Sequence, residues 1–479
     1  MQPGLFGEAS NDLRNQHPQQ QAMAAINAAP RLLSPQRDQV ELRPIDLDAL
    51  LPADHPARSV WSFVNALDLQ PLYAQVRSVT GRAGAPAIDP AMLVALWLWA
   101  TIDGVGSARE IDRLCERDDV YRWICGGVTV NYHTLADFRT RHEAWLDAQL
   151  TRSIVSLMDR SLVKMEVVAQ DGLRVRAWAK ASSFRRRDKL QRLHELAKAQ
   201  LEALKGELDQ DAGASTRRKQ AARERSARER EQRVAQALAT MDKITQAKPP
   251  KPSKRRGSRK QDEGKTKDQG PQKEASKPNG SNRVMPKLVQ TGEPRVSTTD
   301  PEVRVTKMGD GGWRPAFNVQ IAADAETQLI VGIDVVSGTD MKHMSPMHRQ
   351  LQERYAITPQ YWLADGGFGK LDGIRDLYER GTQPILPPYQ TRTPNADPLA
   401  WQRRDTIETH HWRQVMATDW AKDLYIQRAA TIECVNAHLR RRGLTRFHVR
   451  GLVKARAVAL WHALAHNLMR LRSLALSPV

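Results

Sequence analysis

The spacing of apolar residues changes along this 479-residue chain, and the change limits the folds that it can adopt. From Ile45 to about Asp159 apolar residues recur every three or four positions, which predicts helices throughout. Short β-branched runs follow at 166–171, 316–322, 328–336, 360–364 and 384–386. Helical patterns separate or follow the later runs, at 345–355, 371–380, 425–442 and 451–473. Strands that alternate with helices indicate an α/β layer with a mixed sheet.

The chain is strongly basic. Its 73 Lys and Arg against 54 Asp and Glu leave a net charge of +19, which points to a polyanionic partner, most often nucleic acid. The longest apolar run, 91–102, is too short to span a bilayer, so we expect no membrane partner. The N-terminus lacks the pattern of a secretion signal, and the three cysteines are scattered. Both features favour the reducing cytoplasm.

The N-terminal part of the chain divides into two regions by composition. Residues 1–40 are polar and rich in Gln, which predicts a disordered arm, and residues 41–160 are expected to form a helical DNA-binding domain. Ser107–Glu110 and Thr134–Asp137 both fit a capping box, with a Gly-containing turn between them. This arrangement resembles a helix-turn-helix whose second helix offers Arg139 and Arg141 to the major groove. Capped helix pairs also fill many α-domains that bind no DNA, so the pattern alone leaves both interpretations open.

Residues 184–295 differ from the rest of the chain in charge. Arg185–Arg283 contain 28 Lys and Arg against 14 Asp and Glu, and so hold +14 of the net +19. Apolar stripes over 193–208 and 234–241, with a break at 211–213, predict an antiparallel helical hairpin. Beyond Lys248, Pro, Lys, Ser and Gly predict disorder. Basic hairpins are often merely solvated, but we expect this segment to contact a phosphate backbone.

Three acids stand where chemistry could use them. Asp171 ends the first strand run, Asp365 ends a later one within YWLADGGFG, and Glu433 lies in a helical pattern. An Asp before Gly at a strand end is usually a turn residue, and an acid in an Arg-rich helix is usually an ion-pair partner. By these local rules four other acids are equally good candidates: Asp324, Glu326, Asp334 and Asp340.

Longer motifs narrow the choice. The stretch 299–340 (TDPEVRVTKMGDGGWRPAFNVQIAADAETQLIVGIDVVSGTD), then YWLADGGFG, then 425–471 resembles the catalytic half of bacterial insertion-sequence transposases of the DDE class. Residues 43–150, with DHPAR and HTLADFRTRH, are similar to the helical domain that accompanies it in one branch of that group. Together these segments cover most of the chain outside the arm and the basic segment.

The resemblance implies a ribonuclease H-like α/β catalytic core, with a mixed five-stranded sheet, over 161–183 and 296–479. The segment 184–295 would then be an insertion. Asp171, Asp365 and Glu433 become the catalytic and metal-binding acids. The group's helix motif is Tyr, two residues, Arg, three residues, Glu, six residues, Lys. Here Tyr425 and Arg428 match, Arg440 replaces the Lys, and four residues separate Arg428 from Glu433. On an uninterrupted α-helix that extra residue turns Glu433 by about 100° relative to Arg428.

The activity that the resemblance implies is DNA transposition: cleavage at transposon ends, followed by attack of the freed 3′-hydroxyl on target DNA. Two Mg²⁺ or Mn²⁺ ions held by the three acids would activate the attacking oxygen and neutralise the leaving one. The expected partner is double-stranded DNA, both terminal inverted repeats and target, bound by a homodimer in the bacterial nucleoid. The side chains expected to hold DNA are Tyr425, Arg428, Arg440, Arg441, Arg446 and Arg450, besides Arg139 and Arg141.

Two other functions stay open on the sequence alone. One is a nuclease of the same fold that does not transfer strands, and the other is a degenerate copy that only binds DNA. Helix-turn-helix readout argues against the first, and the complete set of acids argues against the second. Because of the extra residue before Glu433, the degenerate copy that only binds DNA stays a possible function.

Overall fold

The computed structural model describes residues 46–79, 85–208, 214–247, 294–388, 397 and 399–474. The predicted arm at 1–40 and the disorder predicted beyond Lys248 lie outside these residues. In the part of the chain that is described, no helix is both long enough and apolar enough to cross a membrane.

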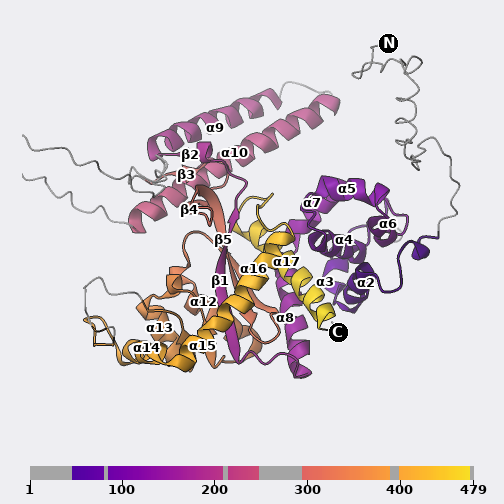
Figure 1. The fold of residues 1–479 in the computed structure, drawn as a ribbon. Helices are drawn as coiled ribbons and strands as arrows, with labels where there is room; N and C mark the ends of the chain where they lie inside the picture. Colours follow the sequence, from indigo (N-terminus) through magenta and orange to yellow (C-terminus); the bar gives the residue numbers. More distant parts are fainter. Residues whose placement is uncertain are drawn as a thin grey trace, which may run out of the picture. The chain divides into compact units, whose positions relative to one another are not determined.

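The described residues from Asp46 to Asp159 form helices and turns without a strand, as predicted. The elements are η1 (Asp48–Leu50), α2 (Pro56–Ala66), α3 (Gln70–Tyr73), α4 (Pro90–Ile102), α5 (Ala108–Arg117), α6 (Asp119–Cys125), α7 (Tyr132–Arg141) and α8 (Glu143–Asp159). Helix α4 is buried from Pro90 to Thr101 because its residues are apolar on every side. Helices α2, α6 and α7 of this region pack against it, and so does α17 (Leu452–Ser473) from the end of the chain (Figure 1).

Both predicted capping boxes are wrong. The Ser107 side chain makes no cap hydrogen bond to α5. Helix α7 begins at Tyr132, where the Asn131 side chain accepts a hydrogen bond from the Thr134 backbone N–H at 3.0 Å. Asn is at least as good an N-cap as Thr, and its position three residues earlier moves Thr134 inside the helix.

A mixed sheet forms the centre of the second half. Its strands are β1 (Val167–Arg176), β4 (Arg304–Lys307), β5 (Trp313–Asp324), β6 (Ile330–Val336), β7 (Tyr361–Leu363) and β8 (Gln383–Ile385). Strand β1 pairs antiparallel with β5 and parallel with β7, which pairs parallel with β8. The other edge of β5 pairs with β4 along its first third and with β6 along its second half.

Two details of the predicted sheet are corrected. The sheet has six strands and not five, because the twelve-residue β5 is long enough to pair with both β4 and β6. Strand β1 does not end at Asp171 but continues to Arg176. It continues because Asp171 and Gly172 stay in the ladder, opposite Ile321 and Gln320 of β5.

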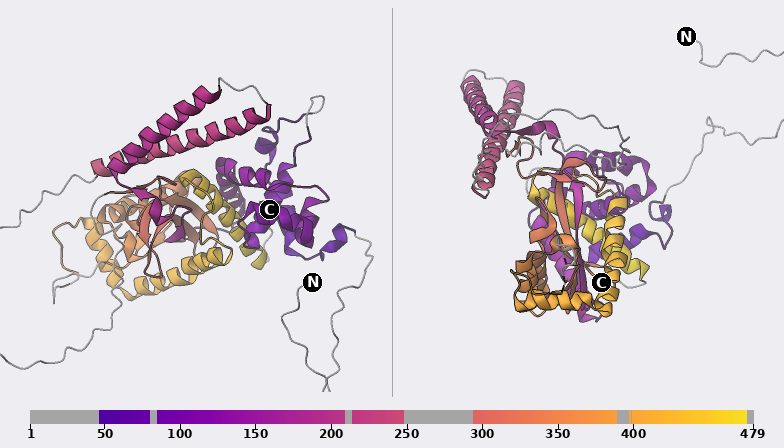
Figure 2. Two further views of the ribbon diagram at one scale, coloured as in Figure 1. Left: turned by 90° about the horizontal axis from the view of Figure 1, so that it is seen from above. Right: turned by 60° about the vertical axis from the view of Figure 1, so that its left-hand side comes forward.

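Helices cover both faces of this sheet (Figures 1 and 2). They are α12 (Met344–Tyr355), α13 (Leu371–Glu379), α14 (Ile407–Ala417), α15 (Asp419–Arg428), α16 (Cys434–Arg441) and α17 (Leu452–Ser473), with short turns η3 (Asp340–Lys342) and η4 (Gly366–Phe368). Helix α17 contacts β6 of the sheet as well as α4, α7 and α8. It therefore belongs to the core of both halves, and the described halves share one continuous hydrophobic core.

The basic segment contains two long helices where the stripes predicted them, α9 (Arg187–Leu208) and α10 (Ala214–Ala247). They lie side by side (Figures 1 and 2). Two short paired strands flank them, β2 (Phe184–Arg185) and β3 (Val296–Ser297), after the turn η2 (Ala181–Ser183). A small separate core joins Leu190 of α9, Ala237 and Met241 of α10, and Val296 of β3.

Candidate metal and DNA site

Two of the three predicted acids follow the same point on neighbouring parallel strands. Strands β1 and β7 pair with Ala169 opposite Leu363, and Asp171 and Asp365 each come two residues later. Their carboxylates are close enough to interact. Burial raises the pKa of Asp171 above its ordinary value, and the like charge of Asp365 raises it further. Two acids that repel each other in this way suit a divalent cation.

Both carboxylates are held in place by hydrogen bonds. The Asn436 Nδ2 of α16 donates to Asp171 Oδ2 at 2.8 Å, and the Gly172 N–H donates to Asp171 Oδ1 at 2.7 Å. The Gly367 N–H donates to Asp365 Oδ1 at 2.8 Å, so Asp365 caps the turn η4. Asn436 was not singled out from the sequence, although it stands three residues after Glu433 and so shares its side of a helix.

A π-helical segment carries the third acid. Residues Ala429–Glu433 form one π-turn between α15 and α16 (Figure 1). A π-turn contains one more residue than an α-helical turn, so it accommodates the extra residue between Arg428 and Glu433. The rotation of about 100° was expected only if Arg428 and Glu433 shared an uninterrupted α-helix, and the π-turn removes that condition: Arg428 Nη2 lies 2.6 Å from Glu433 Oε1.

Arg428 links Glu433 to the strand acids. Its side chain is only 13% exposed, whereas that of Glu433 is 56% exposed. Burial acts to lower the pKa of Arg428, but the Tyr425 side chain, Asp171 and Glu433 together raise it. The Arg428 charge in turn lowers the pKa of Asp171, against the effect of burial. The Arg428 guanidinium thus interacts with two of the three acids.

The three acids do not form one metal-binding cluster in this arrangement. Across the described ranges, no group of three or more His, Cys, Asp or Glu side chains is disposed to hold a metal ion. The donor chemistry nevertheless fits Mg²⁺ or Mn²⁺. Asp171 and Asp365 supply paired carboxylate oxygens, and Glu433 faces them through Arg428.

The rival acids have other partners or face solvent, although the charge of Asp340 also raises the pKa of Asp171. Asp324 accepts hydrogen bonds from the Thr327 N–H and hydroxyl, at 2.9 and 2.7 Å. Asp334 lies 3.3 Å from Arg456 Nε, and Glu326 is exposed. Asp340 accepts from Asn318 Nδ2 at 2.7 Å and from Gln320 Nε2 at 2.9 Å, and it pairs with Arg174 at 3.0 Å.

Asp340 leaves room for only a glycine at position 172. A Cβ at position 172 would lie 1.8 Å from Asp340 Oδ1 and 2.7 Å from Asn318 Oδ1, both closer than any real contact. A side chain at position 172 would therefore overlap the buried hydrogen bonds of Asp340 with Asn318 and Gln320. The glycine leaves room for them and does not end the strand.

The residues expected to bind DNA lie in different surroundings. Arg428 stacks over Tyr425 at 5.7 Å, and Arg440, Arg441 and Arg450 are exposed. Arg446 is half-buried over the Trp178 ring at 5.0 Å. Arg141 is exposed, with Asp137 at 3.7 Å.

Arg139 differs from these residues. It is 8% exposed, so it does not stand on an open helix face as the helix-turn-helix pattern predicted.

A basic groove begins beside Asp171. Its volume is about 380 Å³, and its charged lining residues are Arg174, Arg176, Arg314, Arg440 and Asp310. Asp310 pairs with Arg314 and Asp340 pairs with Arg174, so Arg176 and Arg440 give the groove its positive charge. Gly172, the neighbour of Asp171 on β1, also lines this groove.

Comparisons with known proteins agree with the geometry. Residues 287–468 match a family described as the transposase DDE domain, and residues 45–141 match one described as a transposase domain. The first match includes Asp365 and Glu433 but begins after Asp171. No curated protein and no solved structure gives a significant match.

The two matches lie in the expected order and together cover more than half of the chain. The chain belongs to the insertion-sequence transposases of the DDE class. Such enzymes act on DNA and generally depend on a divalent metal, and the matches favour neither of the two alternative functions. The helical N-terminal region and the mixed sheet with its helices fit a ribonuclease H-like core.

Proposed function

We propose that this chain cleaves DNA at the ends of its element and joins the freed 3′-hydroxyl to target DNA, with Asp171, Asp365 and Glu433 as the catalytic and metal-binding acids. The observation that carries the proposal is the combination of β1–β7 register with the π-turn. The register sets Asp171 and Asp365 side by side, and the π-turn brings Glu433 to Arg428, which interacts with Asp171.

The three acids would hold two Mg²⁺ or Mn²⁺ ions, which supply activation of the attacking oxygen and neutralisation of the leaving one. Asn436 and the Gly172 N–H orient Asp171, and the Gly367 N–H orients Asp365. Arg428 holds the Glu433 carboxylate toward the strands. Arg440 and the arginines of the adjoining groove are suited to hold the DNA backbone next to the acids.

The remaining parts of the proposal concern the molecule around the site. We assign 41–160 to DNA binding, 161–183 with 296–479 to catalysis, and 184–295 to an insertion. The gap between the two family matches supports the insertion, since it contains α9 and α10. Two ends must be cut together, so we propose a homodimer on terminal inverted repeats, acting in the nucleoid.

The test uses purified protein, Mg²⁺ and DNA that carries the element's terminal repeats, with Asp365→Asn beside the wild type. We expect nicking at the repeat ends and, with added target DNA, joined products from the wild type alone. Equal cleavage by both proteins would overturn the assignment of the acids. Cleavage without any joined product would instead support a nuclease that does not transfer strands.

A further inference from the structure

Arg139 carries a charge that the described residues do not neutralise. Its Nη1 donates to the Gly106 carbonyl at 2.6 Å, and its guanidinium lies over the Trp97 ring at 4.9 Å. Its Nε is buried without a partner. Burial lowers the pKa of Arg139 to about 10, and no carboxylate opposes that shift. A buried cation without an anion is costly, which suggests that the anion is a ligand.

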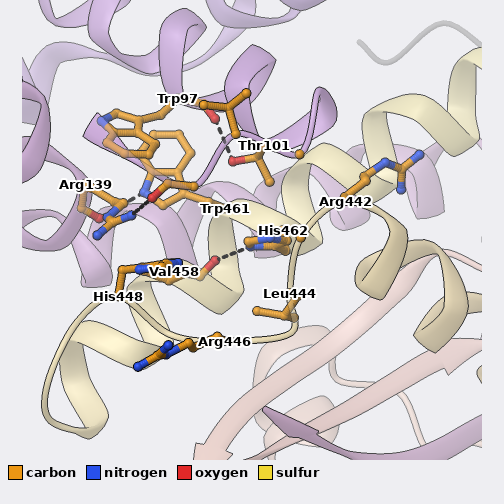
Figure 3. Close-up of a pocket in the computed structure, with 14 residues that line it drawn as sticks. Trp97, Thr101, Arg139, Arg442, Leu444, Arg446, His448, Val458, Trp461 and His462 are labelled. Carbon is orange, nitrogen blue, oxygen red and sulfur yellow. Dashed lines mark hydrogen bonds between the residues drawn. The ribbon is translucent and has the colours of Figure 1, made fainter. Parts of the chain in front are cut away.

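Arg139 opens on a cavity of about 90 Å³ between the helical region and the catalytic half (Figure 3). Fourteen described residues line it, and none of them is Asp or Glu. Helices α4 and α7 contribute Trp97 and Arg139, α17 contributes Trp461 and His462, and the loop after α16 contributes the rest of the charge. The size suits a single phosphate-sized group.

Two further nitrogen-bearing side chains line the cavity. Arg446 has a buried Nε without a partner, and His448 lies beside both arginines (Figure 3). Burial lowers the pKa of His448, and the charges of Arg139 and Arg446 lower it further. Arg442 is not part of this group, because its Nη1 donates to His466 Nδ1 at 3.3 Å.

The cavity and the basic groove lie on two sides of one buried residue. Leu444, which is 1% exposed, lines both the cavity and the groove that Gly172 also lines. The same loop is tied to β1, because the Arg176 N–H donates to the Thr445 carbonyl and the Phe447 N–H donates to the Arg176 carbonyl, at 3.1 and 2.8 Å. Arginines therefore line both spaces on either side of Leu444, the groove and the cavity.

We propose that this cavity binds one backbone phosphate of the DNA strand that occupies the groove, with Arg139 and Arg446 as its cationic ligands. This inference rests on the proposed function. The phosphate neutralises the charge of Arg139. Because residues from the N-terminal helices and from the sheet-containing half both line the cavity, the same DNA contacts both halves. Arg139 therefore recognises DNA through its backbone and reads no base, unlike the readout expected for a helix-turn-helix.

The test is a double-mutant cycle between protein and DNA, measured as binding affinity without divalent metal. End DNA is prepared with a neutral methylphosphonate at one linkage at a time. We expect one linkage at which the substitution weakens wild-type binding about ten-fold and weakens Arg139→Gln binding less than about two-fold. The salt dependence of Arg139→Gln should fall by about one counterion. Additive losses at every linkage would overturn the inference.

Controls separate the possible failures. Arg446→Gln should couple to the same linkage, and it keeps the test valid if Arg139→Gln does not fold. Arg152→Gln removes the same charge from α8, where Arg152 pairs with Asp68 at 2.6 Å, and it should couple to no linkage. If inorganic phosphate stabilises the wild type through Arg139 while no linkage is coupled, the cavity takes a free anion and the DNA assignment is wrong. If the wild type binds no end DNA, the proposed function fails, and this inference fails with it.

Discussion

Helix α17 and the catalytic site both bury polar groups beside the same sheet, but they satisfy them differently. On α17, Asn467 exchanges two hydrogen bonds with Ile330 of β6, at 2.8 and 2.9 Å, and the His466 Nε2 donates to the Gln328 carbonyl at 3.0 Å. Arg456 is surrounded by Glu143, Asp147 and Asp334. At the proposed catalytic site Asp171 faces the like charge of Asp365, and in the separate cavity lined by Trp97 no acid opposes the charge of Arg139.

The difference separates stability from function. Buried polar groups that find partners inside the chain specify the structure, and those left with like charge or none require a ligand. Helix α17 contacts both halves, whereas we propose that the site of Asp171 and Asp365 takes a cation and the Arg139 cavity an anion. Variants in α17 should therefore lower the stability of the fold, whereas variants at the site should lower activity.

Acidification should damage the α17 region most. Burial lowers the pKa values of His462 and His466 to about 4, from 6.5 in the unfolded chain. Depressed values mean that their stabilising contribution is complete above about pH 6.5 and is lost as pH falls through 4. Each can cost up to about 3 kcal/mol. Urea unfolding between pH 7 and 4 measures the loss, and exposed His133→Gln should leave the profile unchanged. A flat profile for the wild type would contradict this assignment.

Inserting one alanine between Ala429 and Ala430 should damage the site without affecting α17. The π-turn already absorbs one extra residue, so a second turns Glu433 and Asn436 away from the strands. We expect cleavage to fall about 100-fold with little change in Tm. Deleting Ala430 is the matched control. It restores three residues between Arg428 and Glu433, which keeps them on one face of an α-helix, so cleavage should stay within about ten-fold. Equal losses from insertion and deletion would refute the role of the π-turn.

Gly172→Ala should destabilise the sheet behind the site by about 1–3 kcal/mol, because its Cβ would overlap Asp340. Chemical denaturation measures the change. Gly309→Ala, where a Cβ meets no atom within 4 Å, should alter stability by less than about 0.5 kcal/mol. If the two variants are equally stable, the close packing of Asp340 on β1 is wrong.

The smallest predicted effect is a gain in stability, caused by Asp171→Asn. The raised pKa of Asp171 means that its charged form opposes folding once pH rises above the unfolded value of 3.8. Asp171→Asn keeps the shape of the side chain and removes the repulsion from Asp365, but only its amide oxygen can still accept, from the Gly172 N–H. Its amide nitrogen donates instead to the Asn436 Oδ1, which has no partner among the described residues, once the Asn436 amide turns over. Without metal at pH 7 we expect Tm to rise by about 1–3 °C while cleavage is lost. A lower Tm would show that the carboxylate stabilises the fold.

Most elements could be predicted from the sequence because their patterns are local. The helices of 46–159, the two helices of the basic segment and five of the six main strands lie where apolar periodicity predicted them. Strand β4 was missed because RVTK is too short to show a period. The end of β1 was misplaced because Gly172 resembles a turn residue, whereas the reason for the glycine is Asp340, far along the chain.

The site was only partly predictable, and long-range packing explains the rest. The extra residue before Glu433 is visible in the sequence, but whether it forms a bulge or rotates the helix depends on contacts such as that of Asn436 with Asp171. Arg139 has the sequence setting of a surface arginine. It is buried where α7 meets α4 and α17: its guanidinium lies over the Trp97 ring at 4.9 Å, and the Trp461 Nε1 donates to its carbonyl at 3.0 Å.

The central claim is that Asp171, Asp365 and Glu433 act together in DNA cleavage, and single-turnover cleavage of end DNA in Mg²⁺ tests it most directly. Asp171→Asn, Asp365→Asn and Glu433→Gln should each lower the rate by about 1000-fold or more, and combining them should lower it little further. Asp334→Asn, an acid on β6 beside Arg456, should cleave like the wild type. Cleavage at the wild-type rate by any of the three variants would contradict the claim.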